Sequence, residues 1–193
     1  MNRKTLTLLI ILWGVLLPVP LISQNTYIIK SCSIVVAGTS NIHDWTAEVG
    51  KSSGSFKLKV EKGKVASVQS VDLKVDAQSL TGSKGSIMNS KIKDALKSKK
   101  NPFITYESTS ITVTDRSVNS KVVANGVLNI AGTPQNVSIE VTGKVLPNGD
   151  IEFSGTKKLK MTDYKVEPPK AMLGALTTAN DVTLTFKVIL KIA

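Results

Sequence analysis

The sequence contains few of the side chains that build catalytic or metal sites. Its 193 residues include one histidine, His43, and one cysteine, Cys32. A structural zinc site needs four such ligands, and the acidic residues do not follow the spacing of a calcium loop. One thiol cannot form an internal disulfide, so the core alone must hold the fold. The sequence therefore predicts no metal ion and no cofactor.

The single histidine stands beside an aspartate, Asp44, which suggests a catalytic triad with Cys32 or a serine as nucleophile. Nucleophilic catalysis needs nucleophile, base and orienting group in contact, whereas adjacent residues of a strand point to opposite faces. The sequence also has no nucleophile-elbow motif. We therefore predict that the protein is not an enzyme, and that His43, Asp44 and Trp45 shape the end of a strand.

Aromatic residues are scarce, at 5% of the chain, and this bears on nucleic-acid binding. Such binding uses aromatic side chains interleaved with basic ones, whereas the lysines here stand mostly among Ser, Thr, Asp and Glu. The Gly-rich stretch 82–86 lacks the full Walker spacing and is more typical of a turn. The sequence predicts a solvated basic surface and no nucleic-acid partner.

Only one apolar run approaches the length of a membrane span, and it lies at the N-terminus. Two basic residues precede an apolar run over residues 5–22, and polar residues follow it. This order is typical of a secretory signal peptide. A retained membrane anchor is the alternative, since a span needs about 20 residues, but Pro18 and Pro20 disfavour a continuous helix. We expect residues 1–24 to be removed on export, which would leave a periplasmic or secreted protein.

Acidic residues are fewer than basic residues. The chain has 25 Lys and Arg residues against 14 Asp and Glu residues, a formal net charge of +11. Without Arg3 and Lys4 the remaining chain keeps a charge of +9. Such an excess favours anionic partners, among them acidic lipid surfaces.

The rest of the chain is dominated by a period of two. Apolar and polar residues alternate over 56–61, 71–76, 137–142 and 182–188. Each such strand has one dry face and one wet face, which is typical of antiparallel sheets. Turn signals such as Asn148-Gly149 separate the runs. We predict an all-β domain over residues 25–193, with eight or nine strands in a closed or nearly closed barrel, because closure removes exposed edges.

Residues 86–100 break this alternation. The apolar residues with helical spacing are Ile87, Met88, Ile92, Ala95 and Leu96, and the lysines opposite them are Lys91, Lys93, Lys97, Lys99 and Lys100. The pattern predicts a short amphipathic helix that ends before Pro102. The helix either lies across the barrel wall or one mouth, or docks its basic face, Lys91–Lys100, onto an anionic membrane.

Five stretches, in order, resemble the YceI-like family of exported polyisoprenoid-binding proteins. They are Gly38–Trp45, Leu96–Tyr106, Asn125–Thr133, Leu159–Pro169 and Asn180–Val182. The resemblance spans roughly residues 33–193. It implies an antiparallel eight-stranded lipocalin-like barrel with one short helix and a bound polyisoprenoid, quinone or similar lipid. The family has no agreed catalytic residues that could be carried over.

An eight-stranded barrel leaves room for one small or elongated ligand in a mostly apolar pocket. The residues predicted to bind it are Trp45, Phe56, Ile92, Leu96, Phe103, Met161, Tyr164, Met172 and Phe186. Each of these side chains could instead be packed in the core of the barrel without touching a ligand. Phe103 and Tyr106 lie three apart, so only one faces inward in a regular strand, and we expect it to be Phe103.

Three hypotheses follow. The first is an envelope carrier or store for a long-chain lipid. The second is a filled barrel that acts as a structural or protein-interaction module, with large side chains meeting across its interior. The third and weakest is an enzyme that uses His43. An exposed edge or mouth could also pair two copies of the chain.

Overall fold

The computed structural model describes residues 25–193, apart from the side chains of Ala171 and Met172. The predicted signal peptide, residues 1–24, lies outside the described residues. Eight long strands form the body of the molecule: β1 (Asn25–Ser40), β3 (Ser52–Glu61), β4 (Lys64–Asp76), β6 (Phe103–Asp115), β7 (Ser120–Ile130), β8 (Thr133–Val145), β9 (Ile151–Lys160) and β11 (Leu176–Ile192).

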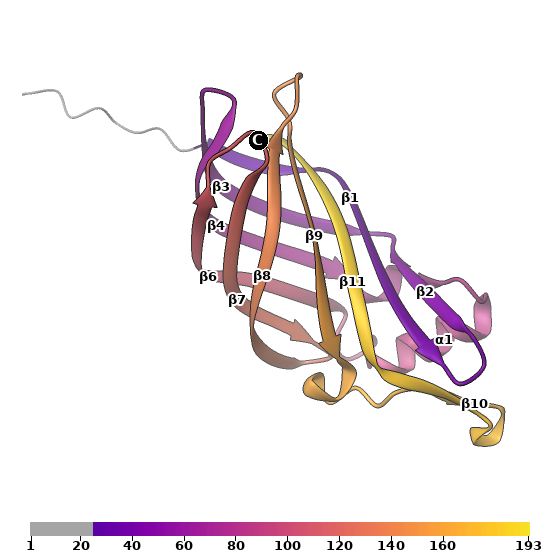
Figure 1. Cartoon of the computed structure of the whole chain (residues 1–193). Coiled ribbons are helices and arrows are strands. Elements are labelled where there is room, and N and C mark those ends of the chain that lie inside the picture. Colours follow the sequence, from indigo (N-terminus) through magenta and orange to yellow (C-terminus); the bar gives the residue numbers. More distant parts are fainter. Residues whose placement is uncertain (1–24) are drawn as a thin grey trace, which may run out of the picture.

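These eight strands close into a barrel. Each strand pairs antiparallel with the next, in the order β1-β3-β4-β6-β7-β8-β9-β11. The pairing of β11 with β1 runs from Tyr27 opposite Ile192 to Ser40 opposite Thr178, and it completes the circle. The predicted all-β, antiparallel eight-stranded barrel is confirmed (Figure 1).

Short elements gather at one end of the barrel, which we call the mouth (Figure 1). They are β2 (Asp44–Val49), η1 (Ala77–Ser79), β5 (Leu80–Gly82), α1 (Ser86–Ala95), η2 (Met161–Tyr164), β10 (Lys170–Ala171) and η3 (Met172–Gly174). Strand β2 pairs with β1 and then with β5, and β10 pairs with β11. The C-terminus lies at the opposite end, which we call the closed end.

The predicted helix is present but shorter than expected. It ends at Ala95, five residues before Lys100. Lys97 has a φ of +50°, and its N–H bonds to the carbonyl of Asp94, so the backbone leaves the helical region there. Hydrogen-bonded turns then carry the chain to Pro102, which begins the approach to β6.

The barrel interior is filled toward the closed end. The residues packed there are Tyr27, Phe56, Leu58, Val65, Val68, Val122, Ile151, Phe153, Val188 and Leu190. Leu58, Val65, Ile151 and Leu190 have no exposed surface. Full burial of such a side chain contributes about 1.5–3 kcal/mol, so this set is a major source of stability. We call it the filled half.

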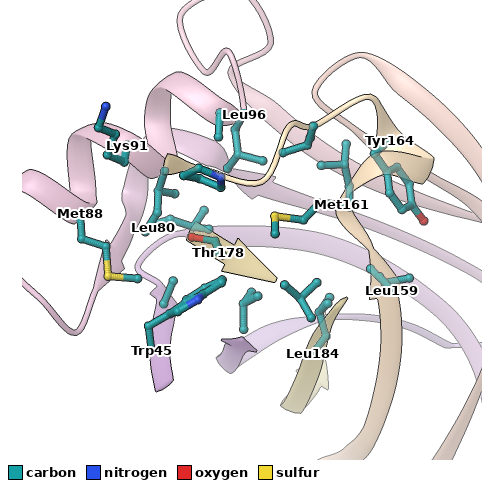
Figure 2. A pocket seen from close by; sticks show the side chains of 18 of the residues that line it. Trp45, Leu80, Met88, Lys91, Leu96, Leu159, Met161, Tyr164, Thr178 and Leu184 are labelled. Carbon is teal, nitrogen blue, oxygen red and sulfur yellow. The ribbon is translucent and has the colours of Figure 1, made fainter. Parts of the chain in front are cut away.

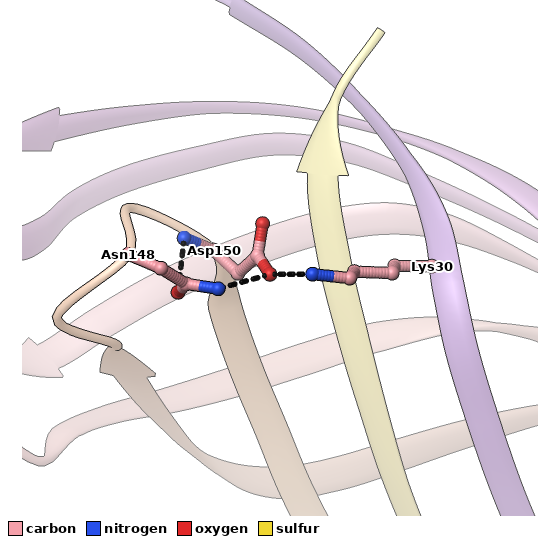
Figure 3. Close-up of polar contacts among 3 residues, drawn as sticks. All are labelled: Lys30, Asn148 and Asp150. Atoms are coloured by element: carbon pink, nitrogen blue, oxygen red, sulfur yellow. Dashed lines mark hydrogen bonds and ion pairs between the residues drawn. The ribbon is translucent and has the colours of Figure 1, made fainter.

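A polar contact ties the closed end together across the seam between the first and last strands. Lys30 of β1 reaches past β11 to Asp150 in the β8–β9 turn, with 2.6 Å between Nζ and Oδ2 (Figure 3). The Asn148 side-chain amide donates to the same carboxylate oxygen over 2.8 Å. The bond from Lys30 is the main reason that the pKa of Asp150 lies below its usual value.

Candidate functional site

The other half of the interior encloses a cavity of about 460 Å³ that opens at the mouth. Its strand walls are made by inward-facing aliphatic residues: Ile34, Val36, Ala47, Val49, Leu73, Val75, Ile104, Leu128, Ile130, Leu159, Val182 and Leu184. Figure 2 shows Trp45, Met161 and Leu184 converging on this space. We call this part of the barrel the open half.

The alternation of the sequence produces these walls directly. Side chains two apart on a strand share one face, so Leu128 and Ile130 of β7 both point inward, as do Val182 and Leu184 of β11. Further along the same strand, Val188 and Leu190 belong to the filled half. One strand therefore contributes to both halves through a single repeating pattern.

Helix α1 covers one side of the cavity. Its lining residues are Ile87, Met88, Lys91, Ile92 and Ala95, followed by Leu96. Their spacing places them on one helical face, whose apolar members are half-buried except for the exposed Ile87. Of the two roles considered for this helix, lying at the mouth is the one that the structure shows.

Trp45 forms part of the cavity wall because a glycine lies against it. The indole packs on Gly38 of the adjacent strand, where any Cβ would overlap the ring. The indole Nε1 donates to the carbonyl of Thr39 over 3.2 Å. These contacts fix the ring at the mouth with its apolar face toward the cavity.

A second anchored segment, η2, brings Met161 and Tyr164 to the cavity. The Thr162 N–H donates to Oδ1 of Asn180 over 3.0 Å, and the Asn180 amide donates back to the Thr162 hydroxyl over 2.9 Å. Tyr164 is 3% exposed. Burial, with a smaller effect from the neighbouring Asp163 carboxylate, raises the pKa of Tyr164 to about 12.

The charged residues at the cavity are all basic. Lys84, Lys91, Lys160 and Lys170 line it, and no carboxylate of the described residues does so. None of these four lysines forms an ion pair among the side chains that the structure describes. The site is therefore an apolar chamber with a positively charged rim.

The arrangement around His43 does not resemble a catalytic triad. His43 is exposed, and its carbonyl accepts hydrogen bonds from the N–H and hydroxyl of Ser40, which closes the β1–β2 turn. Burial raises the pKa of the Cys32 thiol, which is the opposite of nucleophile activation. Over the described residues, no three His, Cys, Asp or Glu side chains cluster as metal ligands would.

The structure brings five of the nine predicted ligand-binding residues to the cavity wall: Trp45, Ile92, Leu96, Met161 and Tyr164. Met172 lies outside the side chains that the structure describes. The remaining three, Phe56, Phe103 and Phe186, are placed elsewhere.

The inward orientation predicted for Phe103 is wrong. Ile104 and Tyr106 face inward, so Phe103 faces outward, where it is 44% exposed. The Lys74 Nζ lies over its ring, 3.7 Å from the ring centroid. Tyr106, the residue passed over, is buried opposite Leu73. The choice between the two depended on the register of β6, which an alternating sequence does not reveal on its own.

Phe56 and Phe186 face the interior, but neither lines the cavity. Phe56 lies opposite Tyr27 and Val71, within the filled half. Phe186 lies over Gly155, where an added Cβ would sit 2.7 Å from the ring. In both cases a large aromatic ring fills space instead of bordering it.

Sequence reasoning missed the aliphatic walls. Val36, Leu128, Ile130 and Leu184 line the cavity, whereas the predicted set contains aromatic residues, methionines and only two aliphatic residues, Ile92 and Leu96. The available signal was position: these residues lie on the inward face near the mouth ends of their strands. Lys84 and Lys170 were also missed, because nothing local distinguishes them from other surface lysines.

The fold and the site define an eight-stranded barrel protein with an apolar internal cavity. The YceI-like domain family matches residues 30–190, and the chain belongs to that family. A comparison with curated proteins gave no match.

Solved structures share the fold at low sequence identity. BcnA from Burkholderia cenocepacia is 20% identical, with a TM-score of 0.65 over 82% of this chain and 95% of its own. A polyisoprenoid-binding domain from Saccharophagus degradans is 14% identical, with a TM-score of 0.65 over 89% of this chain and 100% of its own. A Campylobacter jejuni YceI protein is 18% identical, with a TM-score of 0.59 over 76% of this chain and 84% of its own.

No helix within residues 25–193 combines the length and the apolar character that crossing a bilayer requires.

Proposed function

We propose that the protein holds one long apolar molecule, an isoprenoid, a quinone or a similar lipid, in the open half of its barrel. It would act as a carrier or store in the cell envelope after export. The observation that carries this proposal is the cavity itself, about 460 Å³ of space walled by aliphatic side chains. Its volume falls in the range of about 300–1,000 Å³ that is typical of small-molecule sites.

The chemistry of the wall selects the kind of ligand. Apart from the rim, the lining offers few hydrogen-bonding groups, so a polar molecule inside would lose its water without replacement. An alkyl or prenyl chain makes no hydrogen bonds with water, so it loses none when it enters the cavity. Each buried CH₂ contributes about 0.8 kcal/mol, so fifteen carbons give roughly 12 kcal/mol before association costs of about 4–15 kcal/mol.

The relatives support the same class of ligand. The Saccharophagus degradans domain, which shares the fold, is a polyisoprenoid-binding domain. This chain differs from it at most positions, so the support comes from the shared barrel together with the cavity of this chain.

The main alternative, a filled barrel that serves only as an interaction module, requires large side chains to meet across the whole interior. The filled half fits that description, with Tyr27, Phe56 and Phe153 packed together. The open half does not, because its walls are aliphatic and enclose space. The open half therefore favours ligand binding.

Trp45 provides a direct test, because it is the only tryptophan beyond residue 24 and it lines the cavity. Its fluorescence should change saturably on titration with geranylgeraniol, a C20 prenyl alcohol. Geraniol, with ten carbons, should bind at least a hundredfold more weakly, because it buries about half as much chain. No saturable change with either alcohol would contradict the proposal.

A further inference from the structure

Three exposed apolar side chains surround the mouth. Ile42 lies in the β1–β2 turn and is 58% exposed, Ile87 lies at the start of α1 and is 75% exposed, and Leu173 in η3 is fully exposed. Single exposed apolar residues are ordinary on a protein surface. Three that rise from separate elements around one opening form a surface that another apolar phase can cover.

Hydrogen bonds join two of these elements, the β1–β2 turn that carries Ile42 and the η3 hairpin that carries Leu173. The Asn41 N–H donates to the carbonyl of Thr177 over 3.1 Å, and its side-chain amide donates to the carbonyl of Ala175 over 2.9 Å. The Thr177 N–H returns a bond to Oδ1 of Asn41 over 2.9 Å. Ile42 and Leu173 therefore stand on one connected framework rather than on independent loops.

The start of α1 is tied to the same end of the barrel through β2. The Ser83 N–H donates to the carbonyl of Thr46 over 2.9 Å, and the Thr46 N–H donates to the Ser83 hydroxyl over 3.1 Å. The Gly82 N–H donates to Oδ1 of Asn89, in the first turns of α1, over 2.7 Å. These bonds hold Ile87 at the rim.

Positive charge accompanies the apolar residues. Lys84, Lys91 and Lys170 line the mouth, and the Lys91 ammonium points away from the cavity (Figure 2). An ammonium that points outward does not pair with a group buried in the cavity, but it can pair with negative charges in front of the opening. Near an anionic bilayer, each such lysine strengthens binding about fivefold.

We propose that the mouth docks face-on onto an anionic lipid bilayer, with Ile42, Ile87 and Leu173 entering the headgroup region and the lysines contacting acidic lipids. This sharpens the expectation for the basic helix, because the contact surface becomes the whole rim instead of the helix segment Lys91–Lys100. The inference extends the proposed function, since a docked mouth would let a lipid pass between membrane and cavity without crossing water. Docking itself requires no bound ligand.

A second copy of the chain is the competing occupant of this surface. Mouth-to-mouth pairing about a two-fold axis would set Lys84, Lys91 and Lys170 against their own copies, and juxtaposed like charges oppose association. An anionic bilayer offers the opposite charge and an apolar interior together, so it fits the rim better.

The closed end supplies a matched control. Val118 and Ile192 are each 59% exposed there, close to the exposure of Ile42. Acidic groups are present at that end, among them Asp115, which caps the turn that carries Val118, and Asp150. The closed end therefore combines similar apolar exposure with mixed charge.

The experiment is co-sedimentation of the mature chain with vesicles of phosphatidylcholine containing 30% phosphatidylglycerol, and with vesicles of phosphatidylcholine alone. The rim variant is Ile42→Ser with Leu173→Asn, two residues that do not line the cavity. Asn tolerates the positive φ of +55° at position 173. The control variant is Val118→Ser with Ile192→Ser.

We expect the wild type and the control variant to bind the anionic vesicles and to lose most of that binding in high salt. The rim variant should bind at least about tenfold more weakly, because two large apolar side chains no longer enter the membrane. Geranylgeraniol uptake, followed by Trp45 fluorescence, should be equal in all three proteins, which separates docking from ligand binding.

Equal vesicle binding by the rim and control variants, or no binding by the wild type, would overturn the docking proposal and leave the proposed function standing. So would a concentration-dependent dimer in sedimentation velocity that the rim variant abolishes. Vesicle binding without any lipid uptake would instead contradict the proposed function alone.

Discussion

The filled half and the open half of this barrel are built by the same strands and the same alternating pattern, yet one is solid and the other hollow. Strand β11 contributes Val188 and Leu190 to the filled half, and Val182 and Leu184 to the cavity wall. The difference lies in what the strands place across from one another. Three aromatic residues, Tyr27, Phe56 and Phe153, belong to the packed cluster of the filled half, whereas the strand walls of the open half are mostly aliphatic.

The period of a strand determines which side chains point inward, whereas the size of those side chains determines whether they fill the interior. Additional elements surround the walls of the open half. Helix α1, the β2–β5 ribbon and η2 all pack around the mouth and hold side chains at the cavity edge. The closely packed core and the cavity therefore lie at different ends of one barrel.

The largest expected effect is a difference in the free energy of unfolding between a substitution in the filled half and one in the open half. Leu58→Ala in the filled half should lower the free energy of unfolding by about 2–5 kcal/mol, because it removes a side chain with no exposed surface from a close-packed core. Leu184→Ala, at the half-buried cavity wall, should cost about 1 kcal/mol, because fewer contacts are lost. Urea unfolding of both variants measures the difference, and equal losses would mean that the two halves are packed alike.

A second change should separate the halves by binding. Ala95→Phe on α1 adds a ring at the cavity wall, and we expect geranylgeraniol affinity to fall at least about tenfold as the ring occupies space that the chain would fill. The matched control is Ala179→Phe, at an exposed position of β11 beside the cavity-lining Thr178. If both variants bind alike by Trp45 fluorescence, the ligand does not occupy this cavity.

A third prediction concerns alkaline pH and the anchored segment η2. Because the pKa of Tyr164 is raised to about 12 in the folded protein, the unfolded chain loses this proton first as pH rises. The stability that this group contributes is complete below about pH 10 and is lost between about pH 10 and pH 12. Tyr164→Phe should therefore lose less stability over this window than the wild type does, as measured by thermal unfolding at each pH. Parallel losses would show that the Tyr164 hydroxyl is not held in a buried environment.

The smallest effect belongs to the closed end. Removing the Lys30 ammonium by Lys30→Met should raise the pKa of Asp150 toward its usual value, since the lysine is the main cause of its depression. The stabilisation from this contact is present above the usual pKa of aspartate and is lost as pH falls through the depressed value. Carboxyl chemical shifts followed by NMR would show the change, with Lys64→Met at the start of β4 as the control. An unchanged Asp150 titration would contradict the contact.

The sequence was sufficient to predict the barrel, because alternation and turn signals act locally and the outcome follows from strand geometry. It also indicated that Trp45, Met161 and Tyr164 lie near a cavity, because large apolar side chains in a barrel are candidates for the wall, whereas the resemblance to a family supplied only the barrel and the kind of ligand. It could not place Phe103 correctly, because the inward face of β6 depends on its register with β4, which only the paired strands establish.

The position of the cavity along the barrel axis could not be predicted from the sequence either. Phe56 and Phe186 are large and apolar, as several residues of the wall are, and only the folded chain shows that Phe56 lies opposite Tyr27 and that Phe186 covers Gly155. The need for a glycine at position 38, beneath the Trp45 ring, is likewise a contact between two strands that no local pattern records.

The central claim, that the open half holds a long apolar molecule, is tested most directly on protein purified gently from its own host. Native mass spectrometry of that sample, with organic extraction of a second portion, shows whether a ligand travels with the chain. We expect a defined added mass that extracts as a prenyl lipid or quinone and that is less abundant on the Ala95→Phe variant. A mass equal to that of the bare chain, with no uptake of added prenyl lipid, would contradict the account.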